Sequence, residues 1–517
     1  MRIIIQHLYI YLLILLSAFA NITRAQQFHT PKQAKEYFNQ GNYITALEIY
    51  RILLEKDTTN SEYNHKIGIC YLRTNIDNAK AIPYLERAIK QPKYDKVALY
   101  DLAMAYQYNY RFYDARQMYK EFKAITKGKN SYNVDRQIET CFVAMEMVRH
   151  PLNVRFENLG PEINSEYPDY YPFVAKDESF IVFTSRRSGI MEFDGFYSSD
   201  IWISNSVNGK FTKATNAGTL VNSDFDEQAV GLSDDGKIVF VYTDHIDEYG
   251  DIYTSNRNRK VFEKTVKMGE QINSDYFEAS ASLSADTNTL FFSSFRSGGY
   301  GGLDLYMTRK LPNGEWALPQ NLGQKINTQY NEDFPTLSAD GNNLYFCSDG
   351  HVGMGGYDLF TSTWDTEINT WTYPKNMRYP INTPEDDMTI SFTEDNKHAY
   401  VSAFRKDGVG DLDIYKVTFY DTKTKFAILR LQIPTGDTIN PYIIDTTVTV
   451  TKINKDKPVG IYRPNHNSGF YTIILQPGNY NMMINVDGHK PYDEQFNVTV
   501  ISAYPPVIFK TIKLVPD

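Results

Sequence analysis

The amino-acid sequence predicts a multidomain chain in which an α-helical solenoid precedes all-β domains. The first observation is a pattern that occurs five times between residues 151 and 418, at intervals of 58, 51, 54 and 55 residues. The copies open at Asn164, Asn222, Asn273, Asn327 and Asn382. The second observation is helical periodicity before this region, and the third is strand-like alternation after it. A repeat of this size, made of short strands and Gly-rich turns, is typical of the blades of a β-propeller.

Each copy contains the same elements in the same order. A turn such as residues 232–236 follows the asparagine by about ten residues, and a short apolar run such as residues 290–294 comes next. The copy then closes with an aspartate that precedes an aliphatic and an aromatic residue. The closing aspartates are Asp200, Asp251, Asp304, Asp358 and Asp413.

The closing aspartates have two possible roles. They could form a ring of carboxylates that binds a cation in the channel. Alternatively, each could accept hydrogen bonds from neighbouring Ser, Thr or backbone groups and tie a strand to the next turn. Because the aspartate recurs in every copy, whereas a ligand site usually breaks the symmetry of a repeat, we expect the structural role and no metal site.

The ends of the repeated region predict how the ring closes. The last copy stops at residues 415–417, whereas an Asn-Leu-Gly stretch at 321–323 precedes the fourth copy and a similar stretch at 156–160 precedes the first. A strand near Asn153–Asn158 would therefore complete a fifth blade and remove the exposed edge of an open ring. Six blades, one of them degenerate, are the alternative.

Residues 26–150 are predicted to form a helical domain, because residues 28–150 are helical by periodicity. Ala46, Ala81 and Ala115 occupy matching positions 35 and 34 residues apart, and aromatic residues such as Tyr50 and Tyr119 follow at helical spacing. This pattern resembles the tetratricopeptide repeat, in which small residues let paired helices approach closely. The second repeat departs from the family by one inserted residue near position 77 and by an early proline at position 83. A further helix over 134–148 would cap the solenoid and lead into the propeller.

The tetratricopeptide resemblance implies that the inner helical face binds a partner protein. The residues of that face are predicted to be His65, Ile69, Leu72 and Arg73 in the second repeat, and Tyr100, Met104, Gln107 and Tyr108 in the third. Tyr-rich exposed surfaces suit recognition. The alternative is that these side chains are solvated or pack beside the propeller.

Two further resemblances concern the all-β part. The five copies resemble TolB-type, Trp-Asp-like propeller repeats over residues 151–418. Residues 419–517 show strand alternation at 447–451 and 470–475, followed by a Pro-Gly-Asn-Tyr turn. This segment resembles the regulatory-type β-sandwich first described beside carboxypeptidases, and the match rests on residues 468–488.

The N-terminal residues 1–25 are predicted to be an export signal. Arg2 precedes an apolar run of 13 residues, Leu8 to Ala20, which is shorter than the roughly 20 residues that span a bilayer. Thr23 and Ala25 are small residues at the positions that a signal peptidase inspects, so we expect cleavage before Gln26. The alternative is a signal anchor that stays in place.

The composition excludes several functions. The formal net charge is −9 and no basic stripe accompanies it, so nucleic-acid binding is not expected. Cys70, Cys141 and Cys347 form no CxxC pair and are expected to be buried. The nine histidines form no HExxH array, so neither a zinc site nor another cofactor is predicted. His351, in a blade loop, is expected to be an exposed polar residue.

A catalytic role is also not expected. Prolyl-oligopeptidase-like enzymes carry a propeller of related repeats, but they need a hydrolase domain with a Gly-x-Ser-x-Gly elbow. Only 99 residues follow position 418, and they are predicted to form strands. The glycine clusters at 298–302 and 353–356 lack the Lys-Ser/Thr ending of a phosphate-binding loop.

The order of these regions resembles a family of exported envelope proteins in Gram-negative bacteria that use the type IX secretion system. Fuller members end in an OmpA-like domain that grips peptidoglycan, whereas this sequence stops at Asp517. Peptidoglycan binding is therefore not expected, and membrane association is expected only through partners. The resemblance implies a non-catalytic scaffold for other envelope proteins, in the periplasm or at the outer membrane, within a secretion or gliding-type machine. The alternative is a propeller-based module that binds a sugar or a peptide.

Overall fold

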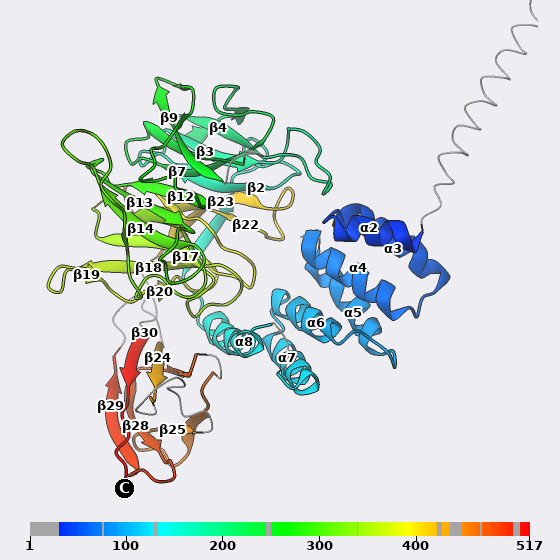
Figure 1. Cartoon of the computed structure of the whole chain (residues 1–517), viewed down its shortest axis with the longest axis vertical. Helices are drawn as coiled ribbons and strands as arrows, with labels where there is room; N and C mark the ends of the chain where they lie inside the picture. Colours follow the sequence, from blue (N-terminus) through cyan, green and yellow to red (C-terminus); the bar gives the residue numbers. More distant parts are fainter. Residues whose placement is uncertain are drawn as a thin grey trace, which may run out of the picture. The chain divides into compact units, whose positions relative to one another are not determined.

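The computed structural model describes residues 30–74, 77–128, 132–244, 250–338, 340–420, 426–434, 446–465, 468–499 and 507–517 (Figure 1). These residues form two compact units. The first comprises residues up to Leu102 together with Phe193–Gly195, and the second comprises Ala103–Glu192 and Phe196–Asp517. The predicted export signal and its cleavage site before Gln26 lie outside the described residues.

The N-terminal region is helical. Its seven described α-helices and one 3-10 helix are α2 (Pro31–Asn39), α3 (Tyr43–Lys56), α4 (Ser61–Thr74), η1 (Asn78–Lys80), α5 (Ala81–Ile89), α6 (Val97–Tyr108), α7 (Phe112–Thr126) and α8 (Val134–Arg149). Polar side chains cap several of them: Thr30 forms a capping box with Gln33, and Asn42 accepts from the backbone N–H of Thr45 at 3.0 Å.

Two sequence irregularities of the second helical pair have local explanations. The inserted residue near Asp77 lies beside η1, where the Asp77 side chain accepts from the backbone N–H of Ala79. Pro83 falls in the first turn of α5, where a proline removes no intrahelical hydrogen bond. The helices α4 and α5 pack closely, since a Cβ at Gly68 would lie 2.5 Å from Cγ of Leu85. Glycine at this position therefore sets the spacing of the pair.

Five antiparallel sheets, consistent with a β-propeller, follow the helices. The first contains β2 (Asp169–Val174), β3 (Phe180–Ser185), β4 (Asp200–Val207), β5 (Lys210–Phe211) and β6 (Thr215–Asn216). The second contains β7 (Asp226–Leu232), β8 (Ile238–Asp244), β9 (Asp251–Asn258), β10 (Val261–Phe262) and β11 (Val266–Lys267). The third contains β12 (Glu278–Leu283), β13 (Thr289–Ser294), β14 (Asp304–Arg309) and β15 (Gln320–Asn321). The fourth contains β16 (Glu332–Leu337), β17 (Asn343–Ser348), β18 (Asp358–Asp365), β19 (Thr370–Trp371) and β20 (Lys375–Asn376).

The fifth sheet joins the two ends of the repeated region. It contains β21 (Ser391–Phe392), β22 (His398–Ala403), β23 (Asp413–Phe419) and β1 (Val154–Asn158). Strand β1 pairs antiparallel with β23, from Val154 opposite Phe419 to Asn158 opposite Tyr415. The prediction that a strand near Asn153–Asn158 completes the sheet of the last copy is therefore confirmed.

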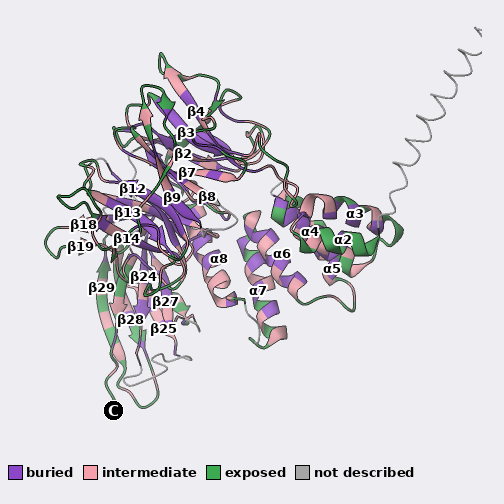
Figure 2. Cartoon of the chain, turned by 45° about the horizontal axis from the view of Figure 1, so that its top comes forward, coloured by how far each residue is buried: buried purple, intermediate pink, exposed green. Residues whose placement is uncertain are grey.

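The strands bury most of their side chains, as Figure 2 shows by colour. All six residues of β3 and all six of β12 are buried. One apolar cluster extends through the five sheets, from Phe173 in β2 to Val417 in β23. The first strands of neighbouring sheets contact one another, β2 with β7, β7 with β12 and β12 with β16. The short apolar runs of the repeats thus contribute to one continuous core.

The C-terminal residues form two packed sheets. Their strands are β24 (Ala427–Gln432), β25 (Val448–Lys452), β26 (Pro458–Tyr462), β27 (Phe470–Leu475), β28 (Gly478–Ile484), β29 (Tyr492–Val498) and β30 (Val507–Thr511). The strand orders are β27-β24-β30 and β26-β25-β28-β29, and the two sheets share one apolar core. Among the described residues, no helix has both the length and the apolar character to cross a membrane.

Candidate functional site

The opening asparagines connect each sheet to the one before it. In every copy, the side-chain oxygen accepts from the backbone N–H of the residue after a closing aspartate, and the side-chain nitrogen donates to the carbonyl of that same residue, at 2.8–3.0 Å. The pairs are Asn164 with Ile414, Asn222 with Ile201, Asn273 with Ile252, Asn327 with Leu305 and Asn382 with Leu359. The Asn164 pair connects the first copy to the last.

Hydrogen bonds tie the loop before a strand to its closing aspartate at Asp200, Asp304, Asp358 and Asp413. Asp304 accepts from the backbone N–H of Tyr300 at 2.6 Å and of Gly301 at 3.1 Å. Asp358 accepts from the backbone N–H of Met354 at 2.8 Å, and burial raises its pKa to about 7. The remaining contacts are Asp200 with Ser188 and Asn216, Asp251 with Lys267, and Asp413 with Asn158 and the backbone of Gly410. Such contacts are those that the structural role requires.

The glycine clusters of the blade loops make room for these carboxylates. A Cβ at Gly299 would lie 2.6 Å from Oδ2 of Asp304, and one at Gly353 would lie 1.7 Å from Oδ2 of Asp358. Only glycine lets the backbone approach the carboxylate this closely. The glycine clusters at 298–302 and 353–356 therefore position an internal aspartate.

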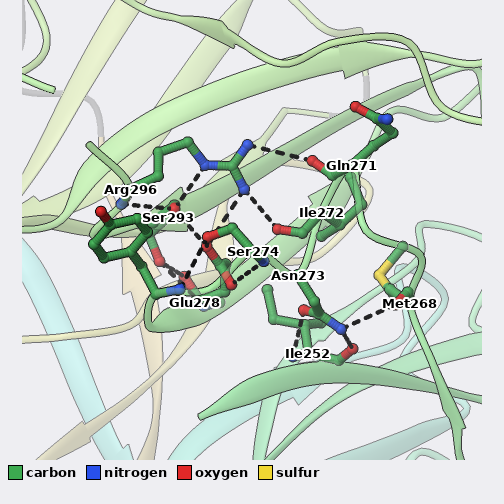
Figure 3. A network of polar contacts seen from close by, with 12 residues as sticks. Ile252, Met268, Gln271, Ile272, Asn273, Ser274, Glu278, Ser293 and Arg296 are labelled. Carbon is green, nitrogen blue, oxygen red and sulfur yellow. Dashed lines mark hydrogen bonds and ion pairs between the residues drawn. The ribbon is translucent and has the colours of Figure 1, made fainter. Parts of the chain in front are cut away.

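A second carboxylate recurs five residues after each opening asparagine. These residues are Asp169, Glu227, Glu278, Glu332 and Asp387. In Figure 3, Glu278 accepts from the backbone N–H of Ser274 at 2.8 Å and from the Ser274 hydroxyl at 2.7 Å, while Arg296 donates to the carbonyl of Ile272 at 2.6 Å. The recurrence of an acid five residues after each Asn-Ser/Thr asparagine is visible in the sequence. The sequence analysis did not assign these acids a role.

These second carboxylates are internal groups. Burial raises the pKa of Glu227 and of Glu332 to about 7, and it raises the pKa of Asp387 well above its ordinary value. Each accepts from the serine or threonine that follows its opening asparagine, for example Thr328 to Glu332 at 2.7 Å. Their carboxylate oxygens thus accept hydrogen bonds from neighbouring residues of the same repeat.

The predicted binding residues of the second helical pair lie in different surroundings. His65 is buried, with Nε2 2.6 Å from Oδ2 of Asp101. Leu72 is also buried, Ile69 is half-buried and Arg73 is exposed. Only Arg73 and part of Ile69 are therefore available to a partner in this conformation.

In the third repeat, Gln107 is buried and contacts the propeller. Its side-chain nitrogen donates to the carbonyl of Met354 at 3.1 Å, and the Tyr119 hydroxyl donates to its side-chain oxygen at 3.0 Å. Gln107 therefore follows the alternative prediction for these residues, which is that they pack beside the propeller. Tyr100, Met104 and Tyr108 are half-buried, and their use in binding stays a prediction.

Helix α8 connects the propeller and the sandwich. On one side, the Arg136 guanidinium lies 4.5 Å from the ring centre of Tyr330 and donates to the carbonyl of Gly350 at 3.2 Å. On the other side, Glu139 pairs with Arg430 and accepts from Asn465 at 3.0 Å. The hydroxyl of Thr472 also donates to Glu139.

A cavity of about 340 Å³ lies at this junction. Arg136, Lys325 and Arg430 contribute charge to its wall, and Tyr373 stacks on Phe509 with ring centres 3.9 Å apart. Because most of these side chains also join α8, the propeller and the sandwich, the cavity belongs to the junction. Among the described residues, no group of three or more His, Cys, Asp or Glu side chains could hold a metal ion.

His351 borders the same cavity and corrects a sequence prediction. It is half-buried, with Nε2 2.7 Å from the carbonyl oxygen of Ile326. Burial lowers its pKa to about 4, so it is neutral near pH 7. The prediction of an exposed polar residue is wrong because the helix and sandwich cover this blade loop, which the local sequence does not reveal.

No family model matches the sequence, and no curated protein matches it. Solved structures show similarity to TolB-like and other β-propeller proteins. TolB from Acinetobacter baumannii is 17% identical with a TM-score of 0.33, and the match covers 50% of this chain and 56% of that one. An α-L-arabinofuranosidase from Lactobacillus brevis is 12% identical with a TM-score of 0.33, and the match covers 54% of this chain and 94% of that one.

A third similar structure is the β-propeller domain of the Trilobed protease from Pyrococcus furiosus. It is 10% identical with a TM-score of 0.25, and the match covers 65% of this chain and 84% of that domain. The similar structures include enzymes and non-enzymes, so they do not distinguish catalysis from binding.

Proposed function

We propose that this protein is a non-catalytic scaffold that binds other proteins of a Gram-negative envelope. The observation that carries the proposal is the set of contacts made by α8, which joins the helical pair α7–α8 to the propeller through Arg136 and to the sandwich through Glu139. Three parts joined in this way present several surfaces, which is what a scaffold needs.

The same proposal extends to the fold of each part and to the place where the protein acts. The helices are of the tetratricopeptide type, the five sheets are the blades of a TolB-like propeller, and the C-terminal sheets are a regulatory-type sandwich. The chain is exported through residues 1–25 and acts in the periplasm or at the outer membrane. Its partners are other envelope proteins of a secretion or gliding-type machine.

The repeated acids support a structural rather than catalytic propeller. A general acid or base needs a carboxyl group that reaches a substrate. Glu278 and Glu332 are fully buried, and each accepts hydrogen bonds from the backbone and hydroxyl of a neighbouring residue. Burial inside the repeat raises the pKa of Glu332 to about 7.

Sedimentation of a gently solubilised envelope extract tests the proposal. A scaffold is expected to migrate with other envelope proteins, in an assembly much larger than the 59.6 kDa chain. Migration as a free single chain under every solubilisation condition would contradict it.

One observation favours the second candidate, a ligand-binding propeller. Tyr171 in β2 and Phe334 in β16 have left-handed backbone angles, φ +51° and +50°, and their ring centres are 4.5 Å apart. Such strain in a bulky residue often occurs where function requires it. A sugar or peptide array tests this candidate: binding that disappears in Tyr171→Ala and Phe334→Ala would support it, and an array without hits would exclude it.

A further inference from the structure

A large groove runs between the helical pair and the sandwich within the second unit. Its volume is about 1170 Å³, and its walls come from α7, α8 and the strands β25 to β28. We name it the helix–sandwich groove and define it by Arg116, Lys120 and Lys127 on the α7 side, Phe142 on α8, and Val459 and Ile461 on β26. None of these residues belongs to the cavity beside His351.

The groove is basic although the chain as a whole carries a net charge of −9. Seven basic and three acidic side chains line it. Each acidic side chain already has a basic partner: Asp135 pairs with Lys123 at 2.6 Å, Glu139 with Arg430, and Glu146 with Arg149.

Five basic side chains of the groove have no ion pair among the described residues. They are Arg116, Lys120, Lys127, Lys452 and Arg463. Burial and the neighbouring charge of Arg116 lower the pKa of Lys120, as expected where positive charges lie together. Nε of Arg116 is buried and has no hydrogen-bond partner among the described residues. The groove therefore attracts an anionic group.

The groove also exposes the edge of a sheet. In the described part of the sandwich, β26 is the last strand of the order β26-β25-β28-β29. An edge strand presents unpaired backbone N–H and C=O groups that can pair with another chain. Pro458 removes one amide at the start of β26, but the residues after it keep theirs. Five residues of strand span roughly 17 Å, the length of a short peptide segment.

The side chains of this edge are apolar and exposed. Val459 is 49% exposed and Ile461 is 65% exposed, whereas Tyr462 packs into the sandwich core. Alternation along the strand thus directs Val459 and Ile461 away from the core. An apolar edge strand that no charged side chain on its own residues protects is unusual for a surface without a partner.

We propose that the helix–sandwich groove binds an extended acidic peptide segment of a partner protein, which adds to β26 as a further strand. Its backbone pairs with β26, its aliphatic side chains contact Val459 and Ile461, and its carboxylates face Arg116, Lys120 and Lys127. The proposal rests on the scaffold function and names the chemistry of one partner. A polyanionic sugar or nucleic acid would use the charges but neither the strand edge nor the apolar side chains.

Fluorescence polarisation with the full chain tests this proposal. The probe is a labelled eight-residue peptide of alternating Glu and Val, and the comparison peptides are the Lys-Val equivalent and octaglutamate. We expect the Glu-Val peptide to bind at least tenfold more tightly than either. Methylation of alternate backbone nitrogens on the pairing edge of the peptide should weaken binding at least tenfold, because it removes the strand hydrogen bonds. Equal binding of octaglutamate or heparin, or indifference to methylation, would overturn strand addition.

Variants of the chain test whether the peptide binds in the helix–sandwich groove. Lys120→Glu with Lys127→Glu should weaken Glu-Val binding at least tenfold, and Ile461→Thr, which keeps a strand-forming residue, should weaken it severalfold. Lys210→Glu with Lys213→Glu makes the same charge change on exposed propeller lysines and should leave binding within about twofold. Equal effects of the two charge reversals would overturn the site. If the groove variant keeps every envelope partner of the wild type and the Glu-Val peptide fails to bind, the groove assignment fails while the scaffold function stands.

Discussion

Replacing Asn164 by alanine tests how the repeated region closes. The change removes the side chain that accepts from the backbone N–H of Ile414 at 2.9 Å and donates to its carbonyl at 3.0 Å. Ile414 is fully buried, so water cannot replace the lost partner. Each unsatisfied buried backbone group costs about 1–3 kcal/mol, so the substitution should destabilise the propeller by about 2–6 kcal/mol.

Tryptophan fluorescence during urea unfolding measures this loss in the propeller alone. The four tryptophans are Trp202, Trp316, Trp364 and Trp371, all within the repeated region. With a urea dependence of about 3 kcal/mol per molar, the midpoint should fall by about 0.7–2 M. Asn222→Ala is the matched comparison, because Asn222 makes the same two contacts with Ile201 at 2.9 Å. The two variants should lose similar stability.

The comparison also defines the contrary result. In a ring that is open between the first and last copies, Asn164 has no partner across the gap. Asn164→Ala would then leave the midpoint unchanged, while Asn222→Ala would still lower it. That outcome would refute the closure by β1 and β23.

Three further predictions concern processing, binding and pH. The exported protein should begin at Gln26, and N-terminal sequencing that finds Met1 to Ala25 intact would indicate a retained anchor. Tyr100→Ala and Tyr108→Ala should each weaken partner binding by about 1–2 kcal/mol if these tyrosines are anchors, and unchanged co-purification of the double variant would exclude them. Burial raises the pKa of Glu227 and Glu332 to about 7 in the folded state, so the unfolded state ionises first as pH rises. The urea midpoint of the propeller should therefore increase as pH is lowered from 7.5 to about 5. A midpoint that falls steadily as pH is lowered over this range would contradict the raised pKa values of the two buried glutamates. Below about pH 4 stability should fall, because aspartates of the blade turns have lowered pKa values and lose their hydrogen-bonded charge.

The periodic features of the fold could be predicted from the sequence because they are local. An opening asparagine and a closing aspartate recur in every sheet, and the Asn-Leu-Gly stretch before the first copy marked Asn158 as part of the last sheet. The recurring acid at the fifth position, as in Glu278, was equally local and was missed. It lies five residues after the more prominent asparagine. Its structural role depends on the neighbouring serine or threonine, whose backbone N–H and hydroxyl donate to it in the folded chain.

The surfaces of the molecule could not be predicted in the same way. Gln107 was expected on the inner helical face that meets a partner protein, but it is buried and donates to the carbonyl of Met354, 247 positions later in the sequence. His351 is likewise half-buried, because α8 and the sandwich lie against its blade loop. The helix–sandwich groove combines Lys120 of α7 with Ile461 of β26, and neither segment alone indicates a cleft. Helical and strand periodicity report which face of an element is apolar, but the partner of each face is set by tertiary packing.

Affinity capture of the tagged full chain from cross-linked envelopes tests the scaffold function most directly. Mass spectrometry compares the captured proteins with those from untagged cells and from cells with the Lys120→Glu, Lys127→Glu chain. We expect the wild-type chain to capture a reproducible set of envelope proteins. The Lys120→Glu, Lys127→Glu chain should lose from this set a partner that carries an acidic, strand-forming segment. A wild-type chain that captures no envelope protein above the untagged background would contradict the scaffold function.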